Sequence, residues 1–197
     1  MPSSPDHLAV VLIGHGAPAT DCPPQLVGEL MSLEWRQVSA PPNGGAAPHH
    51  LEEKPSALTG RAAELDAAIR DWPRHAGNDP YRTGLERLAE TLRPLLPTGQ
   101  LAVGYNEFCR PSIADAVEAV IRGGARRVLV IPSMLTPGGV HAERDIPRAL
   151  EELRRAHPGV AIEYVWPFDL RQVAALLAAH VARAALPGRA SAGAAHG

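Results

Sequence analysis

The chain has 197 residues, enough to bury the core of a single domain. Hydrophobic residues make up 45% and charged residues 20%, as in an ordinary globular protein, and the formal net charge of -2 comes without a long run of lysine or arginine. These values exclude the clustered positive charge of proteins that bind nucleic acids or membrane surfaces, and no apolar stretch is long enough to cross a bilayer.

Four short apolar runs predict the strands of a sheet. The first, residues 8–13, ends at Gly14-His15-Gly16 and is too short for a helix. The others cover residues 101–105, 127–131 and 160–165. Runs of this length that lack a polar alternation are typical of strands buried on both faces.

Helical patterns separate these strands, at residues 80–96, 111–123 and 143–157, and a last one covers 170–186. Pro111 lies at a plausible first helical position, and Gly123 is a common residue at a helix end. The alternation predicts an α/β fold: a mainly parallel four-stranded sheet with right-handed crossovers and helices on both faces, three layers in all.

Residues 18–77 interrupt this alternation. Two helical pieces are expected there, near Gln25–Trp35 and Ser56–Trp72, in a segment far longer than the usual connection. We therefore predict one domain over residues 1–187, with a helical insertion after the first strand at about 18–77. The tail, residues 188–197, is rich in Ala, Gly and Ser and is expected to be disordered.

Three polar residues follow predicted strands at the sheet edge where ligands of open parallel sheets bind. His15 follows the first strand, Glu107 the second, and His141 lies in the loop after the third. Neutral imidazoles bind cobalt, iron and nickel, and a carboxylate beside them can orient a ring or accept protons. Each residue alone is also compatible with an ordinary loop histidine or a solvated acid, but three at one edge favour a metal site.

Three segments resemble motifs of the sirohydrochlorin chelatases, the small cobalt- and iron-inserting family. They are VLIGHG at residues 11–16, EFCRPSI at 107–113, and VIPSMLTPGGVHAERDIP at 130–147. The resemblance covers residues 8–16 and about 81–169. It implies a chelatase-like half domain, with His15 and His141 as the metal-binding and catalytic pair and Glu107 as the assisting carboxylate.

The resemblance also implies an activity and partners. We expect a lyase-class enzyme that inserts Co²⁺ or Fe²⁺, with Ni²⁺ also compatible, into a sirohydrochlorin-type tetrapyrrole of cobalamin or siroheme biosynthesis. The reaction is expected to be independent of ATP and to need no cofactor beyond the substrate metal. A homodimer is expected, because one such domain is about half of the two-domain enzymes of this superfamily.

Some residues depart from the pattern of the family. The insertion, and the residues Gly16-Ala17-Pro18 after His15, are closer to the protoporphyrin-type ferrochelatases, as is Asn78-Asp79-Pro80-Tyr81. A protoporphyrin or coproporphyrin chelatase therefore remains an alternative, and so does a carrier of metal or tetrapyrrole without turnover. A histidine phosphatase is disfavoured because Gly14 stands where such enzymes place an arginine.

The remaining candidates have simpler interpretations. The pair His49-His50 could load metal, although exposed paired histidines are common in loops. Arg74, Arg110 and Arg144 could bind macrocycle carboxylates, although a solvated surface position is the simpler interpretation. Cys109 is expected to pack as a small apolar residue. With only two cysteines, and an N-terminus that lacks the features of a signal peptide, we expect a cytoplasmic protein.

Overall fold

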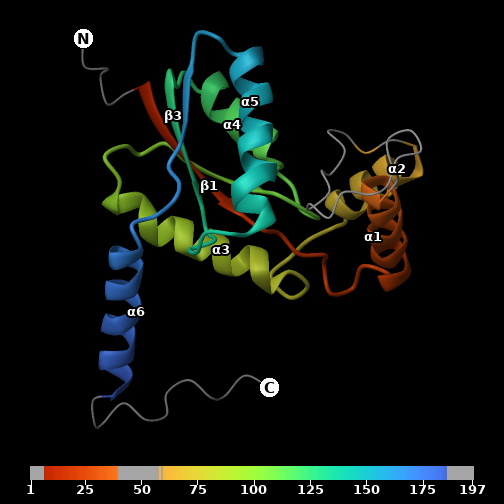
Figure 1. Ribbon diagram of the computed structural model, residues 1–197, viewed down its shortest axis with the longest axis horizontal. Helices are drawn as coiled ribbons and strands as arrows, with labels where there is room; N and C mark the ends of the chain where they lie inside the picture. Colours follow the sequence, from red (N-terminus) through yellow and green to blue (C-terminus); the bar gives the residue numbers. More distant parts are fainter. Residues whose placement is uncertain (1–6, 40–57, 59, 186–197) are drawn as a thin grey trace.

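The computed structural model describes residues 7–39, 58 and 60–185 (Figure 1). Strands β1 (Leu8–Gly14), β2 (Leu101–Tyr105), β3 (Arg127–Pro132) and β4 (Ala161–Tyr164) form one parallel sheet in the order β2-β1-β3-β4. Six of the seven residues of β1 are buried, as expected for a central strand covered on both faces. The predicted α/β fold with four parallel strands is therefore confirmed.

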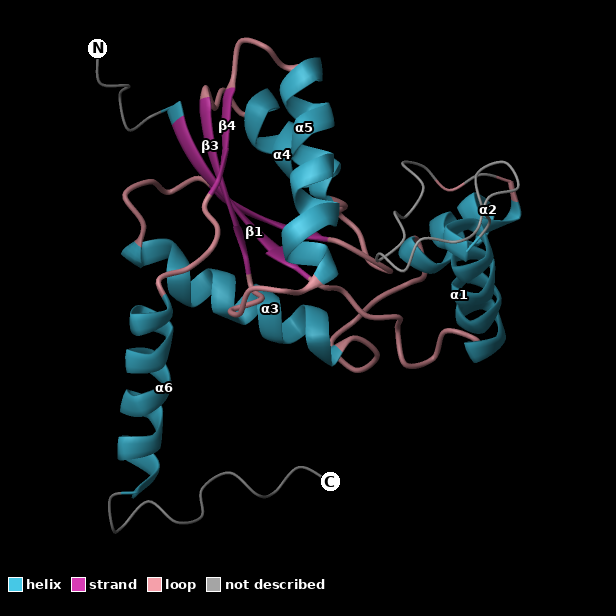
Figure 2. Ribbon diagram, in the orientation of Figure 1, coloured by secondary structure: helices cyan, strands magenta, loops and turns pink. Residues whose placement is uncertain are grey.

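Helices cover both faces of the sheet (Figure 2). Helices α4 (Ile113–Arg122) and α5 (Ile146–Ala156) pack on the face that receives Val11 and Ile13 of β1. Helix α3 (Pro80–Leu92) packs on the opposite face, against Val10 and Leu12. Successive side chains of a strand point to opposite faces, so the apolar run of β1 supplies both layers of the core.

Two helix ends differ from the sequence prediction. Ser112, not Pro111, defines the start of α4: its hydroxyl accepts from the Asp115 N–H while the Asp115 carboxylate accepts from the Ser112 N–H, a reciprocal capping box. Helix α3 ends at Leu92 and continues only as a short 3₁₀ turn, Arg93–Leu95. Pro94 has no N–H to donate to the carbonyl four residues earlier, which accounts for this earlier end.

The predicted helix at 143–157 begins differently as well. Residues His141–Asp145 form a single wide π-helical turn, and the regular helix α5 starts only at Ile146. Pro147 is compatible with this start, because a proline in the first turn of a helix loses no intrahelical bond. The wide turn is a feature of the site described below.

The inserted segment contains α1 (Pro24–Ser39) and α2 (Arg61–Arg70), which pack on each other to one side of the sheet (Figure 1). Their buried residues form a separate small apolar cluster that consists of Ala19, Cys22, Leu30, Ala62, Leu65 and Ile69. The expected helices near 25–35 and 56–72 thus exist with shifted ends. His49, His50 and the tail at 188–197 lie outside the described residues.

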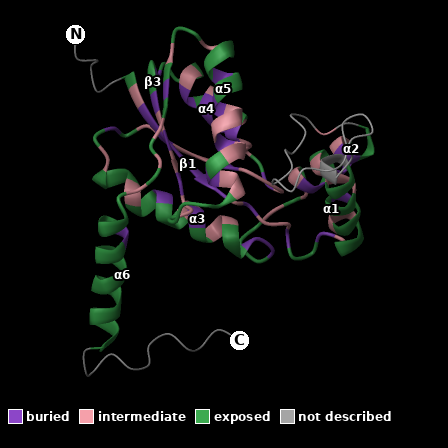
Figure 3. Cartoon of the chain, in the orientation of Figure 1, coloured by how far each residue is buried: buried purple, intermediate pink, exposed green. Residues whose placement is uncertain are grey.

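Helix α6 (Leu170–Ala185) projects from the body of the molecule and is exposed along almost its whole length (Figure 3). Val173 is its one buried residue, whereas Leu170, Leu176, Leu177 and Val181 are each more than half exposed. No helix in the described part of the chain has both the length and the apolar character to span a membrane.

Two leucines of α3 provide a matched test of the core. Leu85 is 6% exposed and packs against the sheet, whereas Leu88 on the same helix is 51% exposed. We expect Leu85→Ala to lower the free energy of unfolding by about 2–5 kcal/mol and Leu88→Ala by no more than about 0.5 kcal/mol. Urea denaturation measures both, and equal losses would contradict this packing.

Candidate metal centre

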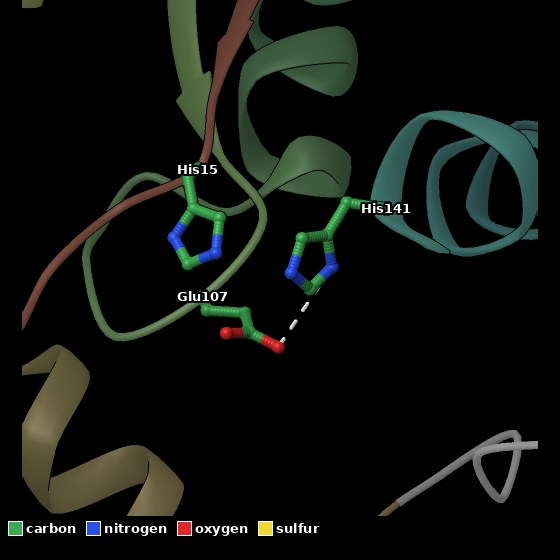
Figure 4. A group of neighbouring side chains, drawn as sticks. All are labelled: His15, Glu107 and His141. Atoms are coloured by element: carbon green, nitrogen blue, oxygen red, sulfur yellow. Dashed lines mark ion pairs between the residues drawn. The ribbon is translucent and has the colours of Figure 1, made fainter. Parts of the chain in front are cut away.

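The three predicted site residues meet at one edge of the sheet (Figure 4). Strands β2, β1 and β3 are neighbours, and Glu107, His15 and His141 follow them in that order. Because the strands are parallel, their carboxyl ends lie at the same edge. The sheet order therefore brings together side chains that are up to 126 positions apart in the sequence (141 − 15).

Backbone pairing continues beyond the ends of β1 and β2. The Asn106 N–H donates to the Gly14 carbonyl at 2.9 Å and the Glu107 N–H donates to the His15 carbonyl at 2.8 Å. Gly16 has a φ of +91°, and a Cβ at this position would lie 1.9 Å from the Glu107 carbonyl oxygen. Only glycine fits here, so Gly16 permits the close approach of the loops that carry His15 and Glu107.

The ligand atoms of this cluster are close enough to bind a single ion. One nitrogen or oxygen from each of His15, Glu107 and His141 lies within 4.8 Å of the others. The two imidazole rings are 4.5 Å apart between centroids and nearly perpendicular, at 84°. The side chains of His141 and Glu107 are 22% and 16% exposed, so the cluster is shielded but open to solvent and ligands.

The His15 ring is oriented by its own loop. Its Nδ1 lies 2.7 Å from the Gly16 carbonyl, which can only accept, so Nδ1 carries the proton and Nε2 of the neutral ring offers its lone pair. The His15 backbone N–H donates to the Tyr81 hydroxyl at 2.8 Å. Helix α3, which carries Tyr81, therefore fixes the backbone of His15.

Two residues missed by the sequence analysis orient His141. Its Nδ1 lies 2.7 Å from Asp145 Oδ2 and 2.7 Å from the Asn106 side-chain nitrogen. If Nδ1 carries the proton, it donates to Asp145; if it does not, it accepts from the Asn106 amide. Either bond fixes the orientation of the ring. Asp145 follows His141 by four residues, and this helical spacing could have predicted from the sequence that the two side chains meet. The Tyr164 hydroxyl also donates to the Ala142 carbonyl and anchors the turn.

Other candidates lie away from the cluster or have structural partners. Cys109 is buried as expected, and its burial raises the pKa of the thiol, so it is not a thiolate ligand at neutral pH. Arg74 is neither a solvated surface residue nor a free partner for macrocycle carboxylates, so both expectations were wrong. Its side chain is 3% exposed and paired with Asp79. Arg110 binds Asp71 and Asp115, and Arg144 lies half-buried in the turn beside His141.

Replacement of Gly16 tests the contact between the two loops. We expect Gly16→Ala to weaken Co²⁺ binding at least about tenfold, because the new Cβ displaces the Glu107 backbone. Isothermal titration measures this affinity. Gly28→Ala is the control, since a Cβ on Gly28 meets nothing within 4 Å. Wild-type affinity in Gly16→Ala would contradict the importance of this contact.

Comparisons with known proteins give relatives for this chain. It is 38% identical to a sirohydrochlorin cobaltochelatase of Methanocaldococcus jannaschii over 86 residues, which are 42% of this chain and 58% of that protein. It is 34% identical to a sirohydrochlorin cobaltochelatase of Methanopyrus kandleri over 77 residues, 39% of this chain and 53% of that protein. The chain thus spans about half the length of the curated relatives it matches.

A solved structure and a family model also match. A cobalamin (vitamin B12) biosynthesis CbiX protein from Marinobacter aquaeolei aligns over 90% of this chain and 97% of that one, with 17% identity and a TM-score of 0.49. The CbiX family model matches residues 77–184, more than half of the 197 residues, a range that includes Glu107 and His141 of the cluster. The chain belongs to the CbiX family.

Proposed function

We propose that this chain is a sirohydrochlorin chelatase that inserts Co²⁺ into the macrocycle without ATP. The observation that carries the proposal is the cluster of His15, Glu107 and His141, whose ligand atoms lie within 4.8 Å of one another at the ends of three neighbouring strands. The similarity to cobaltochelatases supports cobalt as the first metal to test. Fe²⁺ and Ni²⁺ suit the same two imidazoles and carboxylate.

The first role of the cluster is to take up the substrate metal. Two neutral imidazoles and a carboxylate bind a borderline divalent ion and replace part of its hydration shell. Three protein ligands leave coordination positions open, as in catalytic metal sites, so pyrrole nitrogens can approach the same ion. Partial exposure of His141 and Glu107 is consistent with an ion that enters and leaves.

The second role is to accept protons. Metal insertion displaces two N–H protons from the macrocycle, and each needs a base within hydrogen-bond reach. As the ion passes to the pyrrole nitrogens it frees its protein ligands, and the Glu107 carboxylate is then one acceptor. His141 is another, because its ring lies 2.7 Å from the Asp145 carboxylate, which stabilises a positive charge on the imidazole. Two bases beside the metal favour turnover over simple carriage.

We further propose that the single domain, residues 1–187, works as a homodimer in the cytoplasm. Helix α6 supports a dimer, because the described part of the chain buries only Val173 of this 16-residue helix and leaves Leu170, Leu176, Leu177 and Val181 exposed. The free, buried thiols of Cys22 and Cys109 are compatible with a reducing compartment.

A second type of tetrapyrrole is an alternative substrate. The α1–α2 pair and the turn Gly16-Ala17-Pro18 favour a protoporphyrin- or coproporphyrin-type substrate, because both features separate this chain from the short sirohydrochlorin enzymes that it resembles. Parallel assays with the different macrocycles decide between these substrates.

Anaerobic absorbance spectroscopy tests the activity. We expect purified protein to accelerate Co²⁺ insertion into sirohydrochlorin over the blank, and His15→Ala and His141→Ala to lower the rate by more than about 100-fold, because each removes a metal ligand. His7→Ala is the control, because this exposed histidine directly precedes β1, at the strand end opposite His15. Full turnover in either site variant would contradict the site. Tight binding of pigment or metal without insertion would instead identify a carrier.

The mass of the protein in solution tests the proposed dimer. Light scattering should give twice the mass of the chain, and Leu177→Glu should convert the protein to monomer, because it places a charge in the apolar interface that we propose. Glu90→Gln, at an exposed position on α3, is the control. A wild-type protein that is monomeric at micromolar concentration would contradict the dimer.

A further inference from the structure

Arg70, the last residue of α2, binds the loop that carries Glu107. Its Nη2 donates to the Asn106 carbonyl at 3.0 Å and its Nη1 donates to the Cys109 carbonyl at 3.2 Å. These two carbonyls lie on either side of Glu107 and Phe108 in the sequence. One guanidinium therefore fixes both ends of the short segment that contains the carboxylate ligand.

The position of Arg70 is itself fixed within α2. Its Nε lies 2.9 and 2.8 Å from the two carboxylate oxygens of Asp66, one helical turn earlier. The side chains of Arg70 and Asp66 are only 15% and 24% exposed. This pairing fixes the orientation of the guanidinium. Its Nη groups therefore already face the loop and lose little side-chain freedom when they bind it.

Arg74 makes a second connection, which joins the two site loops to each other. Its Nη1 donates to the Ala17 carbonyl at 2.8 Å, and its Nη2 donates to the Phe108 carbonyl. Ala17 follows His15 by two residues, and Phe108 directly follows Glu107. The charge of Arg74 is balanced by Asp79, and both side chains are almost fully buried, at 3% and 2% exposure.

The conformation of the Glu107 loop needs such support. Phe108 has a φ of +57°, in the left-handed region that a bulky residue rarely adopts. Conformations of this kind persist only where the surrounding structure holds them. The Phe108 side chain packs against the apolar cluster of α1 and α2, and its carbonyl accepts from Arg74. The inserted helices thus support this loop through side-chain and backbone contacts.

We propose that Arg70 and Arg74 are positioning residues for the metal site, and that the α1–α2 insertion serves to hold Glu107 in place for the metal. The inference rests on the proposed function only in that Glu107 is taken as a metal ligand. Neither arginine need contact the metal or the macrocycle. They act through the backbone of residues 106–109, so their loss is expected to affect metal affinity through Glu107.

The test uses the full chain and Co²⁺ alone, with affinity from isothermal titration. We expect Arg70→Met to weaken Co²⁺ binding by about 10- to 100-fold, the usual effect of removing a group that orients a metal ligand. Arg70→Lys should lie in between, because an ammonium keeps the charge but not the fork that reaches two carbonyls. The control is Arg61→Met at the other end of α2, which breaks a more exposed ion pair with Glu29 of α1 and whose hydrogen bonds reach no site loop.

A double-mutant cycle with Glu107→Gln separates positioning from a general loss of stability. If Arg70 acts through Glu107, then Arg70→Met should have almost no further effect on affinity in a Glu107→Gln background. The same cycle with Arg70→Lys applies if the methionine variant fails to fold, which melting curves report. Equal effects in both backgrounds, or wild-type affinity in Arg70→Met, would overturn the inference.

The two proposals fail in different ways. Wild-type affinity in Glu107→Gln overturns the role of Glu107 as a ligand, and the positioning role falls with it. Weak binding in Glu107→Gln together with wild-type binding in Arg70→Met leaves the metal site intact and overturns only the role of the arginines. Because no tetrapyrrole is present, the result does not depend on which macrocycle the enzyme uses.

Discussion

The hydrogen bond from the Glu107 N–H to the His15 carbonyl extends the pairing of β1 and β2 past the last residues of both strands. It forms because Gly16 has no Cβ to collide with the Glu107 carbonyl, at a φ that other residues avoid. Two of the proposed metal ligands, a histidine and a carboxylate, are thereby fixed as neighbours by backbone geometry. The third proposed ligand, His141, lies in the turn that follows β3, where Asp145 of the same turn and Asn106 after β2 orient its ring. The proposed site thus combines a rigid pair of residues with a third from a separate turn.

This arrangement suits a metal that is a substrate. A structural site surrounds its ion with four protein ligands, whereas a site that passes its ion to a macrocycle must leave positions open. The proposed site has three ligands, His15, Glu107 and His141, at a partly exposed sheet edge. The insertion lies outside the sheet, yet it contacts the loops on which this edge depends through Arg70 and Arg74. Its proposed role is therefore mechanical support of one ligand, in addition to any contact with the macrocycle.

Much of this could be predicted from the sequence, because short apolar runs predict parallel strands, and His15, Glu107 and His141 follow three of these strands along the chain. The three motifs then predicted the metal chemistry that we propose. What could not be predicted depends on contacts between distant segments. Arg74 is indistinguishable from a surface arginine in sequence, and its burial follows only from the packing of the insertion against the Glu107 loop. The left-handed conformation of Phe108 has no local signal either, since glycine is absent from that position.

The central claim is that one divalent ion binds between His15, Glu107 and His141. Crystals of the full chain grown with Co²⁺ and measured at the cobalt absorption edge test it directly, because anomalous scattering locates the ion independently of any activity. The account predicts a single strong peak within bonding distance, roughly 2.0–2.3 Å, of one atom from each of the three side chains. A peak bound elsewhere, or cobalt bound by only one of the three, would contradict it.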